Sequence, residues 1–292
     1  MRQRTCWVPA LLLAALGACH GMTLTVAPGG RDDATGAGPY ASLAGARDAI
    51  RRIKAAGGLT EPITVRIAAG TYPLTAPLRF TPADSGTATC PITYEAAPGA
   101  KPVFSGGVRA EGITVRPDGL WQARVPGVGA EWLPEQLYVN GRHATRARTP
   151  NKDYLYTLRP AESDGNKQVY LDKKDAQPLT TLSPAELAEV NLVAYFSWES
   201  ARLRIASYNP ANGLMVATGN AAWGLNGFYS SQTRQRYQLE NLRSALDEPG
   251  EWYLGRDGVL LYSPKPGETP ATAELILPRT ERFLTFAGEL RS

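Results

Sequence analysis

The feature that most constrains the fold is a turn-rich aromatic stretch at residues 236–267. Residues 252–254 and 259–262 are two short runs of aromatic and aliphatic side chains, which are enriched in strands. Gly258 between them can adopt the positive φ of a tight turn, and two prolines follow the second run. The stretch therefore predicts a β-hairpin.

Composition extends this prediction to the whole chain. The 292 residues include 29 glycines and 23 prolines, and 43% of the residues are hydrophobic. This balance is typical of a turn-rich, all-β protein rather than of a helical one. The length allows one large domain or two modest ones, with enough residues to bury a sizeable core.

Charge and histidine content argue against several classes of function. The formal net charge is +4, and no cluster of Lys and Arg is interleaved with aromatic residues, so nothing predicts nucleic-acid binding. The two histidines, His20 and His143, are too few and too far apart to favour a two-histidine metal site or a histidine-based triad. We expect neither a metal nor another cofactor.

Three parts of the sequence form one recognisable pattern. The first is formed by residues 63–80, 83–86 and 104–107, and the second by residues 137–151. The third part consists of Glu240, Asn241, Ala245, Leu246, Asp247, Pro249, Gly250, Glu251, Trp252, Tyr253, Leu254, Gly258, Leu260 and Tyr262. Together these parts resemble glycoside hydrolase family 141. Within the third part, Gly255 stands where members of that family usually have aspartate.

The resemblance implies the N-terminal part of a secreted right-handed parallel β-helix of the pectin-lyase-like superfamily. It also implies an antiparallel insertion domain, and a main β-helix with the active site that would follow Ser292. The expected domains are a signal peptide at 1–19, a helix-capped N-terminal part with the first coils at 22–111, a β-rich insertion domain at 112–270, and the start of the returning β-helix at 271–292.

Periodicity independently predicts a helix followed by stacked strands. Ser42 can N-cap a helix with apolar residues at 43, 46, 50 and 53, and Gly57-Gly58 would end it. Strand-like runs follow at 63–67, 78–80, 92–95 and 103–105. The 29 positions from Ile63 to Ile92 and the 25 from Leu78 to Val103 suggest a loose repeat of stacked coils, with the helix covering their end. Periodicity alone also permits a β-sandwich with one stray helix.

Hairpin signals dominate the expected insertion domain. Asn140-Gly141 fits a type I′ turn, and residues 209–213 would join the strand-like runs 201–208 and 214–217. Ser183 and Glu186 form a capping box with proline at the first helical position, which predicts a short helix. Residues 273–277 and 283–286 are strand-like, and we expect both to return to the solenoid.

The N-terminus predicts export. Arg2 and Arg4 precede an apolar stretch at 7–16, and Leu-Gly-Ala-Cys at 16–19 resembles a bacterial lipobox. Cys19 would then carry lipid and be the one point of membrane contact, on the bacterial cell envelope. The alternative is an ordinary secretory signal, a secreted protein, and an incidental Cys19.

Cys90 is predicted to be a small buried hydrophobe. Cys6 and Cys19 are removed or modified during export in either reading, so Cys90 has no partner for a disulfide. No histidine lies near it in sequence, which argues against a nucleophile.

Glycoside hydrolysis generally requires two carboxylates at a defined separation. The catalytic candidates in this chain are Glu199, Asp247 and Glu251. Asp84 follows a proline in a turn, so its side chain is expected to hydrogen-bond to the backbone two residues further on. No motif identifies which carboxylate would be catalytic.

Aromatic residues near an arginine favour sugar binding. Trp198, Trp223 and Tyr229 could present flat rings to a pyranose, and Arg202 could donate to its hydroxyl or carboxylate groups. Arg202 with Tyr229 would be the pair to consider for lyase chemistry. The alternative for all four is packing within hairpins.

The sequence leaves three functional hypotheses open. The first is an exported glycoside hydrolase acting on plant or bacterial polysaccharide, with its catalytic carboxylates mostly beyond Ser292, so that this chain is inactive alone and its partner is a missing C-terminal β-helix. The second is a non-catalytic module that binds polysaccharide or oligosaccharide, or a polysaccharide-lyase-like β-helix. The third is a truncated gene product without activity.

Overall fold

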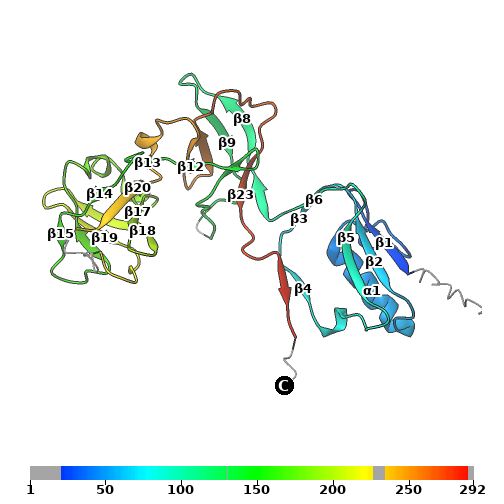
Figure 1. Cartoon of the computed structure of the whole chain (residues 1–292). Helices are drawn as coiled ribbons and strands as arrows, with labels where there is room; N and C mark the ends of the chain where they lie inside the picture. Colours follow the sequence, from blue (N-terminus) through cyan, green and yellow to red (C-terminus); the bar gives the residue numbers. More distant parts are fainter. Residues whose placement is uncertain (1–20, 130, 226–233, 289–292) are drawn as a thin grey trace, which may run out of the picture. The chain divides into compact units, whose positions relative to one another are not determined.

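A computed structural model describes residues 21–129, 131–225 and 234–288, and these form two compact units. Unit 1 comprises the described residues up to Gly106 together with those from Arg282 onward, and unit 2 comprises Gly107–Glu281. Both are built mainly from strands, so the mostly-β class is confirmed. Figure 1 shows the strands of each unit and the main helix, α1, in unit 1.

Unit 1 contains parallel strands. Its three-stranded sheet has the order β1-β2-β5, and Ile63 lies opposite Ile92 in it, which confirms the repeat of 29 residues. Two further parallel pairs are β3 with β6 and β4 with β24. The elements are β1 Met22–Val26, α1 Leu43–Gly57, β2 Ile63–Ile67, β3 Gly70–Pro73, β4 Leu78–Phe80, the 3-10 turn Pro82–Asp84, β5 Ile92–Ala96, β6 Pro102–Ser105 and β24 Leu284–Phe286.

One expected repeat is wrong. Val103 lies opposite Thr71 rather than opposite Leu78, so its register separation is not the expected 25 residues. Leu78 instead lies opposite Leu284, which is far away in sequence. Strand-like composition located the runs correctly, but partner choice depends on tertiary packing that a short apolar run does not specify.

The helix α1 begins and ends where the sequence predicts. The Ser42 hydroxyl accepts from the Gly45 amide at 3.0 Å, and Gly58, with φ of 82°, terminates the helix. Ala46 and Ile50 pack with strand residues such as Leu24 and Val65 in one apolar core. Burying a side chain the size of Ile50 contributes about 1.5–3 kcal/mol, so this face attaches α1 to the sheet.

Unit 2 contains a five-stranded and a four-stranded sheet, both mainly antiparallel, around one core. Their strand orders are β12-β21-β22-β9-β8, in which the β12–β21 pair is parallel, and β11-β10-β23-β7. Trp252 is fully buried in this core. The strands are β7 Gly107–Arg109, β8 Glu111–Val115, β9 Trp121–Arg124, β10 Tyr138–Val139, β11 Arg142–His143, β12 Thr145–Arg146, β21 Glu251–Leu254, β22 Val259–Tyr262 and β23 Leu275–Pro278.

An eight-stranded sheet forms the rest of unit 2. Its order is β13-β20-β17-β18-β19-β16-β15, and β14 also pairs with β20. A second apolar core covers one face of this sheet. The elements are β13 Arg148–Thr149, β14 Leu155–Tyr156, β15 Arg159–Pro160, β16 Gln168–Tyr170, the 3-10 turn Gln177–Leu179, α2 Pro184–Leu187, β17 Asn191–Tyr195, β18 Ser200–Asn209, β19 Leu214–Ala217, β20 Arg236–Glu240 and the 3-10 turn Arg243–Ala245.

The predicted turns of unit 2 are confirmed. Asn140 and Gly141 have φ of 50° and 74° between β10 and β11, as a type I′ turn requires. The turn before Gly213 joins β18 to β19, and Gly258, with φ of 80°, lies between β21 and β22. The capping box of α2 is also present.

The two expected returning strands have different partners. β24 pairs with β4 in unit 1, as expected of a strand that rejoins the coils. β23 pairs antiparallel with β7 and β10 within unit 2, so its expected return to the solenoid is wrong. This pairing places Leu275 and Leu277 in the Trp252 core, which the sequence of a single strand could not indicate.

Candidate functional site

The most unusual surface of unit 2 is a polar face of the eight-stranded sheet. Strand alternation places Leu192 and Leu239 in the apolar core on one side. On the other side Asn191 lies opposite both Arg204 and Glu240. The arginine face consists of Arg148, Arg202, Arg204, Arg236 and Glu240 on this side of the sheet. It also includes Arg146 on β12 of the neighbouring sheet and Glu135 in the loop before β10, which lie against it.

Two carboxylates partly neutralise the arginine face. Glu240 Oε2 accepts from Arg202 Nη2 at 2.8 Å and from Arg202 Nε at 3.1 Å. Glu135 lies 3.4 Å from Arg204 Nη2 and 3.7 Å from Arg202 Nη1. Glu240 is 5% exposed, so its charge depends on the arginines for compensation.

Arg146 lies beneath this cluster without a hydrogen bond. Its side chain is 4% exposed, and none of its three guanidinium nitrogens has a hydrogen-bond partner. Glu135 is 4.0 Å away, and the guanidinium carbon is 5.5 Å from the centroid of the Trp252 ring. Burial lowers the pKa of Arg146 to about 10, so the group stays charged at neutral pH and adds positive potential to the face.

A group of tyrosines surrounds Arg236 at the solvent-exposed end of the arginine face. Arg236 lies opposite Tyr195 on β17 and opposite Tyr156 on β14. The Tyr154 and Tyr195 ring centroids are 5.0 Å apart, and the guanidinium carbon of Arg236 is 5.1 Å from the centroid of Tyr154. Tyr154 and Tyr156 are 37% and 40% exposed, so flat rings and a cation face solvent together.

Trp198 and Trp223 also form an exposed pair. Their centroids are 5.1 Å apart in an edge-to-face arrangement, and their exposures are 59% and 37%. The sequence therefore identified two aromatic residues that do come together. Tyr229, the third expected aromatic, lies outside the described residues, while Arg202 is on the arginine face, where it pairs with Glu240.

Of the three catalytic candidates, Asp247 and Glu199 lie in loops, whereas Glu251 is the first residue of β21. Glu251 is 3% exposed, and its Oε2 accepts from the amides of Asp247 and Glu248, each at 3.1 Å. Burial raises the pKa of Glu251, in spite of these hydrogen bonds. Asp247 is exposed and accepts from Asn151 Nδ2 at 2.7 Å. Glu199 is exposed in the turn between β17 and β18, where its carbonyl accepts from Phe196.

These placements give Glu251 a structural role in closing its turn. Within the described part of the chain, no group of three His, Cys, Asp or Glu side chains could hold a metal ion.

Asp84 holds the loop after β4 in unit 1. Its two oxygens accept from Arg51 Nε at 2.6 Å and Nη2 at 2.7 Å, and one also accepts from the Thr81 amide at 2.7 Å. The Arg51 guanidinium, followed by the Thr81 hydrogen bonds, lowers the pKa of Asp84 to about 2. The structural role expected for Asp84 is thus supported, although its partners are not the backbone groups two residues on.

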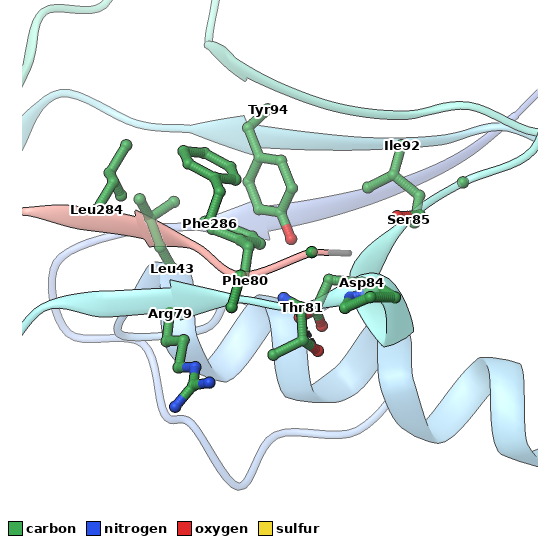
Figure 2. Close-up of a pocket in the computed structure, with 14 residues that line it drawn as sticks. Leu43, Arg79, Phe80, Thr81, Asp84, Ser85, Ile92, Tyr94, Leu284 and Phe286 are labelled. Carbon is green, nitrogen blue, oxygen red and sulfur yellow. Dashed lines mark hydrogen bonds between the residues drawn. The ribbon is translucent and has the colours of Figure 1, made fainter. Parts of the chain in front are cut away.

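Unit 1 carries an apolar hollow of about 1120 Å³. Figure 2 shows the rings of Phe80, Tyr94 and Phe286 facing it, with Leu43 and Leu284 nearby. Phe80 stacks on Phe286 with centroids 5.3 Å apart, and burial raises the pKa of Tyr94 to about 12. Phe286 is nevertheless 76% exposed, so much of this apolar surface faces solvent.

Cys90 is 8% exposed and unpaired, as expected of a buried hydrophobe. Cys19 lies outside the described residues. None of the helices that the structure describes is both long and apolar enough to cross a membrane.

Sequence reasoning missed most of the arginine face. Glu135, Arg146, Arg204 and Glu240 come from different strands and one loop, so nothing in sequence links them. The alternation of arginines at 146 and 148, and again at 202 and 204, was an available signal for polar faces on neighbouring strands.

Comparison with known proteins supports the resemblance seen in the sequence. A family profile described as the GH141 insertion domain matches residues 118–265, just over half of the chain. The chain therefore belongs to the family of proteins with a GH141 insertion domain. No curated protein matches its sequence.

A solved structure described as a glycoside hydrolase is similar in fold. The TM-score is 0.79 at 27% sequence identity, and the match covers 92% of this chain and 48% of that one. The chain thus spans about half the length of that glycoside hydrolase.

Proposed function

We propose that the chain is the N-terminal part of an exported glycoside hydrolase with a right-handed parallel β-helix, acting on plant or bacterial polysaccharide. The observation that carries the proposal is the similarity of nearly the whole chain to half of a glycoside hydrolase, together with the GH141 insertion-domain match. The N-terminal sequence pattern supports export, by lipid anchor or by secretion.

Unit 1 supports the β-helix part of the proposal. Its strands pair in parallel and in register, as the successive coils of a solenoid do. The β4–β24 pair leaves Phe286 and Leu284 exposed beside the hollow, at 76% and 48%. We infer that further coils cover this apolar surface, because large exposed apolar patches mark interaction sites.

The buried carboxylates of Glu251 and Asp84 favour structural roles over catalytic ones. Glu251 is committed to two backbone amides and Asp84 to an arginine and a threonine. A glycosidase needs one carboxylic acid and one carboxylate that can reach the same glycosidic bond. We propose that the additional coils supply that pair, and that this chain alone does not hydrolyse glycans.

An activity comparison tests the proposal. The chain alone and a form extended through the downstream reading frame would be assayed for reducing-sugar release from plant and bacterial polysaccharides. We expect activity only in the extended form. Hydrolysis by the chain alone, abolished by Glu199→Gln or Asp247→Asn, would place catalysis within these residues and overturn the proposal.

A non-catalytic glycan-binding module is the second candidate function. The exposed Trp198–Trp223 pair favours it, because exposed aromatic rings can stack on sugars. It predicts that both forms bind glycans, that neither hydrolyses them, and that Trp198→Ala weakens binding. Hydrolysis by the extended form would exclude it.

A further inference from the structure

We propose that the exposed end of the arginine face binds an acidic, carboxylate-bearing oligosaccharide. The site comprises Tyr154, Tyr156, Tyr195 and Arg236. That its ligand is a glycan rests on the proposed function, whereas the preference for negative charge rests on the arginine face itself.

The geometry places rings and a cation on one surface. Register puts Tyr156, Arg236 and Tyr195 in one row across β14, β20 and β17, so their side chains leave the same face of the sheet. Tyr154 adds a second ring, tilted by 58° to that of Tyr195. Tyrosine rings offer an apolar surface to the C–H groups of a sugar and a hydroxyl to its oxygens.

The site is held in place by buried hydrogen bonds. The Tyr195 hydroxyl donates to Gln238 Oε1 at 2.8 Å. Gln238 is 4% exposed, and its amide donates to the carbonyls of Pro150 and Asp153 at 3.1 and 3.0 Å. These bonds join the segment before β14 to the sheet, so the Tyr154 and Tyr195 rings are already positioned, which lowers the entropy cost of binding.

The charge favours an acidic ligand. The arginine face has five arginines and two carboxylates, and both carboxylates lie against Arg202 rather than Arg236. In the described part of the chain, Arg236 has a ring contact but no ion pair. The buried Arg146 adds positive potential that no hydrogen-bonded acceptor offsets. A guanidinium beside an aromatic ring is therefore available for a carboxylate.

The test is calorimetric titration of the full chain with oligogalacturonate and, separately, with alginate oligosaccharide. The matched neutral probe is fully methyl-esterified oligogalacturonate, which keeps the backbone and loses the charge. We expect binding of at least one acidic probe, at least tenfold weaker binding of the methyl ester, and weaker binding as salt rises from about 50 to about 300 mM.

Variants localise the site. We expect Arg236→Gln and Tyr154→Ala each to weaken binding of the acidic probe about tenfold. Arg243→Gln removes a positive charge from an exposed position elsewhere in unit 2 and is expected to have little effect. Unchanged unfolding curves, measured by tryptophan fluorescence, would verify that the variants are folded.

Three results would overturn the proposal. They are no binding of either acidic probe, equal binding of the methyl ester, and equal weakening by Arg243→Gln. Its failure is distinguishable from that of the proposed function. Hydrolysis by the extended form without acidic binding removes only this inference, while acidic binding without any hydrolysis removes only the enzymatic proposal.

Discussion

Units 1 and 2 differ in how their strands pair and in what their interiors contain. Unit 1 stacks parallel strands under one amphipathic helix and leaves an apolar hollow open. Unit 2 uses antiparallel hairpins, and all buried polar or charged residues of the described chain lie in it. The interior of unit 1 is thus mainly apolar, whereas unit 2 also buries polar side chains whose hydrogen bonds help to select strand register.

Asn241 illustrates the polar strategy of unit 2. It is 1% exposed with φ of 62°, and its side-chain oxygen accepts from the Leu254 amide at 3.1 Å. Its amide group donates to the carbonyls of Leu254 and Glu189, at 3.1 and 3.3 Å. One side chain therefore completes three backbone hydrogen bonds that no strand provides.

The two units can be followed separately. Apart from Trp7, all tryptophans lie in unit 2, so tryptophan fluorescence reports its unfolding. Hydrogen exchange in α1 reports the unfolding of unit 1.

The largest effect is expected for Trp252→Ala. Trp252 is fully buried in the core of unit 2, and its truncation should lower the free energy of unfolding by about 3–5 kcal/mol. The control is Trp223→Ala, at a position 37% exposed, with an expected loss below about 1 kcal/mol. Both are measured by denaturant titration; equal losses would mean that the core assignment is wrong.

Asn241→Ala should have the next largest effect. It leaves buried backbone groups of Leu254 and Glu189 without partners, which should cost about 1–3 kcal/mol in unit 2. Asn220→Ala, at an exposed position, is the control. Urea unfolding followed by fluorescence gives both values. A loss for Asn241→Ala no greater than that of the control would contradict the role of this side chain.

Asp84 should make unit 1 sensitive to acid. Its pKa is about 2 in the folded chain and near 3.8 when unfolded, so it contributes about 2 kcal/mol above pH 4. Because the folded pKa is depressed, this contribution is lost as the pH falls through 2. Exchange rates in α1 should show Asp84→Asn destabilising unit 1 at pH 6 and making little difference at pH 2.

The matched variant for this experiment is Arg51→Gln, which removes the main cause of the low pKa. It should reduce the acid sensitivity of unit 1. Glu251 in unit 2 should show the opposite pH dependence. Its pKa is raised in the folded chain, so its contribution to the free energy of unfolding is present at low pH and is lost as the pH rises through the folded-state pKa. An identical pH profile for Asp84→Asn and the parent would rule out this assignment.

The smallest change in stability is expected for Phe286→Ser. Phe286 is 76% exposed, so the unfolding free energy should change by no more than about 0.5 kcal/mol. Binding of a hydrophobic dye should nevertheless fall, since Phe286 lines the apolar hollow. Val115→Ser, an isolated exposed residue of unit 2 at 60%, should leave dye binding unchanged. Equal dye binding in both variants would argue against an interaction surface.

Features that depend on a few neighbouring residues could be predicted from the sequence, whereas tertiary contacts could not. Ser42, Asn140-Gly141 and the α2 capping box act within a few residues, and all three predictions are confirmed. The strand pairing of Val103 and the Arg202–Glu240 contact depend on partners brought together by the whole fold. Local steric and hydrogen-bonding rules therefore identified turns and caps, while the arginine face could not be assembled from sequence.

The antiparallel pairing of β7 with β23 has a consequence for how such proteins evolve. Gly107, where the chain enters unit 2, lies directly opposite Pro278, just before it leaves. A module whose two ends are neighbours can be gained, exchanged or deleted at a single loop of its host with only a short splice. Unit 2 could thus be exchanged between related proteins while the fold of unit 1 stays intact.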